Sequence, residues 1–329
     1  MAATLLVAGG VSACNASSGA EGETKTIRYQ SYTGMVDPAE LADALGYFDG
    51  TGIQLDRIGD VQGGPESLRA AATNQVDYGA AFNGAIAKLA STGAPIKAVV
   101  AYYGTEGDVS GSLLVKKGSQ LDEASDFVGK KIAVNTLGAN NEAVLDTYFV
   151  EEGLTQDEID QITLVPLPSI NTEAALREGQ VDAGYLSNAL KEAALQRGGL
   201  TEVVNDLELI GPYNGGSFAM TERFIAQNPT TTQQFVEAVA KAVDYAQSHS
   251  VDEVREVMQG YLEEHDRGDY AAALDLWRGT GVPSKGGVVR DEDFTLWLEW
   301  LEAEGEVEAG SIEPSELYTN EYNPFAKED

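Results

Sequence analysis

Two stretches of this sequence share one pattern. Residues 75–83 read QVDYGAAFN, and residues 180–188 read QVDAGYLSN. Gln, Val, Asp, Gly and Asn fall at the same offsets, and Asp77 and Asp182 are 105 residues apart. In each copy an apolar run leads to small residues and then to an Asn. We interpret each copy as a short strand that ends at a tight corner, from which a helix begins.

The Asn at the end of each copy suits a helix start, because its side chain can accept a free backbone N–H of the first turn. In open α/β sheets, ligands bind outside the carboxyl ends of the strands. The repeat therefore predicts two similar α/β lobes whose corners face each other across a cleft. The alternative is coincidence, because Gly and Asp are common in turns.

The composition limits the kinds of partner. The 329 residues suffice for two domains, and 43% of them are hydrophobic, as in an ordinary globular protein. The formal net charge is −32, which argues against a nucleic-acid partner and against direct attraction to anionic lipid. An acidic surface keeps a protein soluble, and a halophilic source would give the same signal.

Cysteine and histidine are scarce. The chain holds one Cys, Cys14, and two His, His249 and His265. No internal disulfide and no zinc cluster of Cys and His can form, so we expect neither a metal nor a cofactor. Catalysis by a Cys–His pair is disfavoured, because the Cys lies in the N-terminal leader. We expect both His residues at the surface.

The N-terminus looks like an export signal. Residues 1–13 are apolar or small and end in Val-Ser-Ala before Cys14, which is typical of a secretory signal peptide. A Cys directly after such residues resembles the bacterial lipobox, although no Lys or Arg precedes the apolar run and the true start may lie upstream. Residues 14–24 would then be a lipidated Cys and a flexible tether. The alternative is a disordered tail with an incidental Cys.

The remaining chain alternates between strand and helix patterns. Residues 26–102 read as βαβαβαβ, which is typical of an α/β domain. A crossing strand at residues 113–115 opens a second series, and residues 217–220 cross back. From residue 230 the apolar positions recur at spacings of three and four, which predicts helices. We expect the aromatic tail, with Tyr318, Tyr322 and Phe325, to pack back on the first lobe.

Several motifs together resemble one family. They are residues 46–48 (GYF), 52–55 (GIQL), 75–77 (QVD), 126–134 (DFVGKKIAV), 179–183 (GQVDA), 224–229 (FIAQNP) and 318–320 (YTN). Their order and spacing over residues 26–320 are similar to those of ABC-transporter substrate-binding proteins of the nitrate, sulfonate and taurine type. That group also contains binders of the thiamine pyrimidine precursor.

This resemblance implies a type II periplasmic-binding-protein fold. Such a fold has two α/β lobes, each a mostly parallel sheet flanked by helices, with two crossovers and a ligand cleft between the lobes. Residues 25–112 and 214–329 would form lobe 1, and residues 113–213 would form the inserted lobe 2. The lobes would close on the ligand by a hinge motion.

The strand ends and helix starts supply the candidate ligand residues. A helix N-terminus offers free N–H groups and a positive dipole end, so it binds anions without Lys or Arg. The candidates are Ser31, Tyr32, Gly63, Gly64, Pro65, Phe82, Asn83, Thr136, Gly138, Ala139, Asn140, Ser187, Asn188, Tyr213 and Asn214.

Each candidate also has an ordinary structural interpretation. The glycines and Pro65 can be a simple turn, and Asn83 and Asn188 can cap helices and touch nothing else. Phe82, Tyr185 and Tyr213 suit a core as well as a cleft. Lys130 and Lys131 are better explained as a solvated strand start. The acidic residues 106–108 could pair with an amine on a ligand but suit a solvated crossover.

The resemblance implies a solute-binding lipoprotein on the outer face of the cytoplasmic membrane. It would be a monomer, would bind a small organic anion such as a sulfonate, and would deliver it to an ABC permease. The aromatic residues near the strand ends also permit a pyrimidine or another heterocycle, and nitrate is a third option. No bond would be broken.

Two other classes of function stay open. One is an enzyme on the same fold that makes or converts pyrimidine or menaquinone precursors. The leader disfavours it, and so does the lack of paired carboxylates, Cys or His near the strand ends. The other is a sensor domain that feeds a membrane receptor, but the sequence shows no output segment after the binding lobes.

Overall fold

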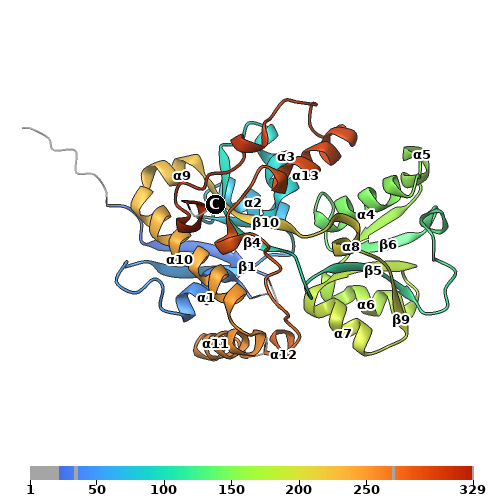
Figure 1. Ribbon diagram of the computed structural model, residues 1–329, viewed down its shortest axis with the longest axis horizontal. Coiled ribbons are helices and arrows are strands. Elements are labelled where there is room, and N and C mark those ends of the chain that lie inside the picture. The colour runs from blue at the N-terminus through green and yellow to red at the C-terminus, as the bar shows by residue number, and fades with distance from the viewer. Residues whose placement is uncertain (1–21, 33–35, 269–270, 328–329) are drawn as a thin grey trace, which may run out of the picture.

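The structure is a computed structural model that describes residues 22–32, 36–268 and 271–327. Two α/β lobes lie side by side (Figure 1). One has a two-stranded and a three-stranded sheet, the other has one five-stranded sheet, and helices flank the sheets of both. We call the part with strands from both halves of the chain lobe 1, and the part with strands from residues 111–205 lobe 2. The predicted fold class is confirmed. Cys14 and the signal peptide lie outside the described residues.

Lobe 1 is completed by a strand that comes late in the chain. Its strands are β1 (Thr26–Ser31), β2 (Gln54–Asp60), β3 (Gly79–Phe82), β4 (Ile96–Thr105) and β10 (Tyr213–Thr221). β1 and β2 pair in parallel, whereas β10 lies between β3 and β4 and is antiparallel to both. The third strand starts at Gly79, inside the first copy of the repeat, and Gln75 to Asp77 form the bend before it.

Lobe 2 has one sheet of five strands. They are β5 (Gly111–Lys116), β6 (Lys131–Val134), β7 (Thr163–Pro166), β8 (Ala183–Ser187) and β9 (Leu200–Asn205), in the order β7-β6-β8-β5-β9. β6 is parallel to β7 and β8, and β5 is antiparallel to β8 and β9. Parallel strands need crossover helices, and these helices cover the sheet.

Helices cover the sheets of both lobes (Figure 1). In lobe 1 they are α1 (Pro38–Ala44), α2 (Gly64–Ala72), α3 (Asn83–Ser91), α9 (Glu222–Gln227), α10 (Pro229–Ser248), α11 (Val251–Glu264), α12 (Ala271–Leu274) and α13 (Glu292–Ala303). In lobe 2 they are α4 (Asn140–Glu151), α5 (Gln156–Ile159), α6 (Ser169–Glu178), α7 (Asn188–Gln196) and α8 (Asp206–Ile210). Within the described part of the chain, none of these helices is long and apolar enough to cross a membrane.

The repeated Asp makes the same hydrogen bonds in both lobes. The Asp77 carboxylate accepts the backbone N–H of Arg28 at 2.7 Å, and the Asp182 carboxylate accepts that of Lys131 at 2.9 Å. The backbone N–H of each Asp donates to the carbonyl of that same partner residue. Each Asp therefore joins its strand to the neighbouring parallel strand, which is why the pattern occurs twice.

The repeated Gly lets a helix approach the strand. A Cβ on Gly79 would lie 2.9 Å from the carbonyl oxygen of Ser67 on α2. A Cβ on Gly184 would lie 2.6 Å from the Thr172 methyl group on α6. Both distances are too short for a residue with a Cβ. The repeated Gly is therefore explained by helix–strand packing at equivalent places in the two lobes.

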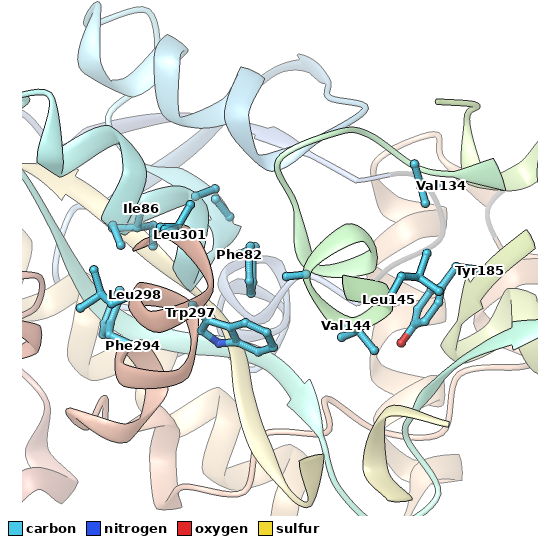
Figure 2. Close-up of a cluster of buried hydrophobic side chains, with 14 of the residues drawn as sticks. Phe82, Ile86, Val134, Val144, Leu145, Tyr185, Phe294, Trp297, Leu298 and Leu301 are labelled. Carbon is cyan, nitrogen blue, oxygen red and sulfur yellow. The ribbon is translucent and has the colours of Figure 1, made fainter. Parts of the chain in front are cut away.

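One buried cluster reaches across both lobes. It contains Phe82 and Trp297 from lobe 1 and Val144 and Leu145 from α4 of lobe 2. Figure 2 shows Phe82 and Trp297 on the side of lobe 1 that faces α4. The rings of Phe82 and Trp297 meet edge to face, with their centroids 4.8 Å apart. The lobes therefore touch through apolar side chains.

The tail returns to lobe 1, as its aromatic residues predicted. Tyr318 forms a parallel bridge with Ala98 on β4, and Phe325 packs against the buried cluster of lobe 1 that contains Tyr78 and Phe235. The 3-10 helices η3 (Lys285–Gly287), η4 (Pro314–Glu316) and η5 (Pro324–Lys327) belong to this segment, and η1 (Ala124–Phe127) belongs to lobe 2. Lobe 1 thus contains both ends of the described chain.

Candidate functional site

Two predicted site residues from opposite lobes, Gly63 and Thr136, lie against each other. Gly63 precedes α2 in lobe 1, and Thr136 follows β6 in lobe 2. A Cβ on Gly63 would lie 2.8 Å from the Thr136 methyl carbon. Close by in the chain, the Tyr213 hydroxyl donates to the Asn140 amide oxygen at 3.2 Å, which links β10 to the first residue of α4. We call these four residues the lobe junction.

Five helices that follow the strand ends begin without a side-chain cap. They are α2, α3, α4, α6 and α7, whose N-cap residues are Gly63, Phe82, Ala139, Pro168 and Ser187. In contrast, Asp37 caps α1 by accepting the N–H of Ala39 at 2.8 Å. Uncapped first turns leave backbone N–H groups available for a ligand or water. The two uncapped starts at the lobe junction, α2 and α4, come from opposite lobes.

The prediction that Asn83 and Asn188 cap helices is wrong. Each is the first residue of its helix, one place after the N-cap. The Asn83 amide instead donates to the Asn214 carbonyl at 3.0 Å and accepts from the Ser217 hydroxyl at 2.8 Å. Asn83 is fully buried, so its side chain fastens α3 to β10.

The Asn214 side chain is also buried and hydrogen-bonded inside lobe 1. Its amide nitrogen donates to Asp293 at 2.8 Å and to the Ser284 hydroxyl at 3.0 Å, and it is 1% exposed. Burial raises the pKa of Asp293 to about 6, although the hydrogen bond from Asn214 acts in the opposite direction. The Asn214 side chain therefore ties β10 to the C-terminal segment.

Asn188 differs from its counterpart in the first lobe. Its φ angle is +50°, in the left-handed region that non-glycine residues seldom adopt. Its N–H donates to the Ser110 carbonyl in the crossover from β4 to β5. Such a backbone conformation costs about 1 kcal/mol and tends to be kept at functional sites. Asn188 thus stays a candidate ligand residue.

The other predicted residues fall into two groups. Tyr32, Gly138 and Ser187 keep partly exposed positions at strand ends or helix starts, whereas Ser31, Gly64, Phe82 and Ala139 are buried. The Ser31 hydroxyl accepts from Arg57 at 2.7 Å, and Gly64 packs directly on Ala81 of β3. Pro65 sits in the first turn of α2 and fixes its start.

A buried carboxylate joins the two crossovers at the hinge. Asp206 lies in the second crossover, and its carboxylate accepts the N–H of Gly111 at 2.8 Å and the Thr105 hydroxyl at 3.2 Å from the first crossover. It also accepts the hydroxyl of Tyr185 at 3.0 Å. The single Tyr213 hydroxyl proton is shared between Asp206, at 3.3 Å, and Asn140, at 3.2 Å. Burial raises the pKa of Asp206, and these hydrogen bonds oppose the rise.

The sequence did not point to Asp206, Tyr103 or Asn135. Tyr103 is partly exposed on β4, and its ring covers Gly215 and Gly216 of β10. Asn135 directly precedes Thr136, and its buried amide oxygen has no hydrogen-bond partner among the described residues. The sequence held one indication for Asp206. It lies where the chain returns from lobe 2 to lobe 1, and a carboxylate there can accept hydrogen bonds from both segments that connect the lobes.

A separate cavity of about 250 Å³ lies away from the junction. Its walls include Asn74, Pro95, Thr221 and Arg223, at the opposite ends of the lobe 1 strands. Across the part of the chain that is described, no group of three or more acidic, His or Cys side chains is arranged to hold a metal ion. The candidate site is therefore the lobe junction with its helix starts.

Comparison with known families identifies the chain. The model of the family described as NMT1/THI5 like matches residues 37–252. The chain belongs to this family. The resemblance noted in the sequence is thereby confirmed. A search of curated protein sequences gives no significant match.

Solved structures share the fold of this NMT1/THI5-like chain at low sequence identity. A protein from Bordetella bronchiseptica RB50 is 20% identical, with TM-score 0.72, covering 93% of this chain and 98% of its own. The periplasmic aliphatic sulphonate binding protein SsuA from Escherichia coli is 18% identical, with TM-score 0.64, covering 90% and 92%. The periplasmic nitrate-binding protein NrtA from Synechocystis PCC 6803 is 11% identical, with TM-score 0.67, covering 88% and 84%.

An enzyme has the same fold. The desulfurization enzyme DSZB is 17% identical, with TM-score 0.61, covering 91% of this chain and 97% of its own. Identities this low show the fold alone, and one fold can serve both binding and catalysis.

Proposed function

We propose that this chain is the extracytoplasmic solute-binding component of an ABC importer. It captures a small organic anion, sulfonate-like or taurine-like, between its lobes and delivers it to a membrane permease. Membership of the NMT1/THI5-like family and the fold shared with a sulphonate-binding and a nitrate-binding protein support this proposal. The proposed division into lobes is residues 25–112 with 214–329, and residues 113–213.

The observation that carries the proposal is the approach of two uncapped helix starts from opposite lobes. The N-cap of α2, Gly63, meets Thr136, three residues before the N-cap of α4. The positive dipole end and the unbonded N–H groups of each first turn stabilise a negative charge without Lys or Arg. Pro65 leaves α2 with one N–H fewer, and each first turn also holds an acidic residue, Glu66 in α2 and Glu142 in α4. An anion between the lobes would contact both helix starts only when the lobes are closed.

A second candidate ligand is a pyrimidine or another small aromatic heterocycle. The partly exposed Tyr32 and Tyr213 flank the strand ends, and Tyr103 lies on the neighbouring strand. Rings of this kind stack on aromatic ligands. Asn140 and Asn135 supply the amide groups that would bind ring nitrogens.

The lipid anchor and the partners belong to the same proposal. Cys14 would carry the lipid after removal of residues 1–13, and residues 14–24 would form the tether. The protein would work as a monomer on the outer face of the cytoplasmic membrane, and its contact with the membrane would be through the anchor. It would act without nucleic acid, cofactor or metal.

The deciding experiment is a thermal-shift screen of the chain with Cys14→Ser. The panel holds taurine, alkyl and aryl sulfonates, nitrate, bicarbonate, the thiamine pyrimidine and flavin-like rings. A ligand that binds the folded state stabilises it by about 2.7 kcal/mol at a hundred times its dissociation constant. A shift with sulfonates supports the anion, and a shift with pyrimidines alone supports the second candidate.

The same samples separate binding from catalysis. Any compound that gives a shift is incubated with the protein and recovered for mass spectrometry. Recovery of the unchanged compound supports a binding protein. Conversion of the compound would replace the proposal with an enzyme of the DSZB-like fold, and no shift with any compound would overturn the proposed ligand classes.

A further inference from the structure

One polar contact between the lobes lies outside the proposed ligand site. The Trp300 indole N–H, on α13 of lobe 1, donates to the Asp146 carboxylate on α4 of lobe 2 at 3.0 Å. The two helices lie against each other, and both residues are partly buried. Figure 1 shows α13 and α4 at the facing edges of the two lobes. Separation of the two lobes would break this contact.

The surroundings of Asp146 are acidic. The charged groups that act on it are Glu142 on its own helix, Glu304 at the end of α13, and Asp160 at the end of α5. Glu304 is in turn opposed by Glu142, Asp160 and Glu306, and Glu306 pairs with Lys88 of α3 at 2.8 Å. Closure thus brings a lobe 1 carboxylate toward three carboxylates of lobe 2.

We propose that the Trp300–Asp146 contact is a proton-dependent latch, which holds the lobes closed when the Asp146 carboxyl is neutral and loosens when it ionises. A neutral carboxyl still accepts the indole N–H through its carbonyl oxygen. An ionised carboxyl keeps that hydrogen bond but is repelled by Glu142, Glu304 and Asp160 in a half-buried place. The latch acts whichever solute the lobes hold, so it does not depend on the proposed ligand.

The direction of the pH effect follows from linkage. Burial raises the pKa of Asp146 to about 7, with Glu142, Glu304 and Asp160 adding to the rise and the Trp300 hydrogen bond opposing it. Opening the lobes returns Asp146 to water and removes Glu304, so its pKa falls toward the ordinary value. The closed form then binds the proton more tightly, and closure is favoured below about pH 7 and lost as the pH rises through that value.

The test measures lobe closure directly by single-molecule fluorescence energy transfer. The full chain carries Cys14→Ser, Ser91→Cys in lobe 1 and Gln120→Cys in lobe 2, both at exposed positions, with a donor and an acceptor dye. The ratio of closed to open molecules is followed from pH 8 to pH 6 at constant ionic strength. We expect this ratio to rise about tenfold over that range, as one proton linked to closure requires.

Three variants separate the latch from other effects. Asp146→Asn keeps an acceptor for Trp300 but has no ionisable proton, so the ratio should stay high and vary less than twofold with pH. Trp300→Phe keeps the ring but removes the donor, so the ratio should fall about two- to tenfold at every pH. Glu151→Gln removes a charge from an exposed position of the same helix and should behave as the parent.

Two results would overturn the latch. One is a parent protein whose ratio does not change with pH. The other is an Asp146→Asn variant that responds to pH as strongly as the parent. Both results concern lobe closure and not solute binding, so they are independent of the solute screen.

Discussion

Asn83 shows how a residue that resembles a ligand contact can be structural. Its amide is fully buried and bonded to the Asn214 carbonyl and the Ser217 hydroxyl. Asn83→Ala would leave both partners without this bond in the interior. We expect the free energy of unfolding to fall by about 1 to 3 kcal/mol, measured by urea denaturation. Asn171→Ala, at an exposed site on α6, should change it by less than about 0.5 kcal/mol.

Gly63 offers a test of closure that leaves charge and backbone unchanged. Its φ angle of −157° suits any residue, but a Cβ would collide with Thr136 across the junction. Gly63→Ala should therefore weaken binding of a compound found in the screen by about tenfold or more, with stability within about 1 kcal/mol of the parent. Titration calorimetry gives the affinity.

Gly260→Ala is the matched control for that change. Gly260 lies on α11, and its added Cβ would meet nothing within 4 Å. It should leave the affinity unchanged and stabilise α11 slightly, because Ala is the better helix former. Equal affinity of Gly63→Ala and the parent would show that the ligand does not require the closed junction.

At the scale of elements, the two crossovers depend on Asp206. Its carboxylate accepts hydrogen bonds from Thr105 and Gly111 of one crossover and from Tyr185 of β8, and it shares the hydroxyl proton of Tyr213, in the other crossover, with Asn140. In Asp206→Asn the amide N–H₂ would face groups that are themselves donors. We expect a loss of about 2 to 4 kcal/mol in unfolding free energy, because buried donors lose their acceptor.

Asp108→Asn provides the comparison for Asp206→Asn in urea denaturation. Asp108 lies in the first crossover but is exposed, so its substitution should cost less than about 0.5 kcal/mol. Similar losses in the two variants would contradict the role of Asp206 as the bond between the crossovers.

The same scale shows what the sequence could predict. The repeat, the Gly positions and the apolar periodicity all depend on local packing. They therefore predicted the strands, the two successive runs of strands and helices, and the return of the tail to lobe 1. The roles of Asn83 and Asn214 could not be predicted, because a buried amide and a ligand-binding amide look alike until their partners are known. Trp300 and Asp146 lie far apart in the chain, and no local pattern connects them.

For the whole molecule, we expect stability to rise on mild acidification. Burial raises the pKa of Asp37 to about 8, of Asp146 to about 7 and of Asp293 to about 6, each from an ordinary value of 3.8. The folded state therefore binds protons that the unfolded state has released, and this stabilisation is lost as the pH rises through 6 to 8. Unfolding free energy should be greater at pH 6 than at pH 8 by about 2 to 4 kcal/mol.

Urea denaturation at fixed high salt tests this pH dependence, since salt screens the general repulsion of a chain with net charge −32. Asp37→Asn keeps an N-cap side chain for α1 but removes its titration. This substitution should reduce the change in unfolding free energy between pH 6 and pH 8. A profile as steep as that of the parent would show that Asp37 is not a source of the effect.

The position of β10 has a consequence for how the chain is made. β3 and β4 are separated in the sheet by β10, which follows the whole of lobe 2 in the sequence. While a ribosome has released only the residues up to 212, β3 and β4 are present but the strand that joins them in the sheet is not. A chain proposed to be threaded through a membrane before folding gains from this order, because lobe 1 stays incomplete until β10, about two thirds of the way along the chain, has been synthesised.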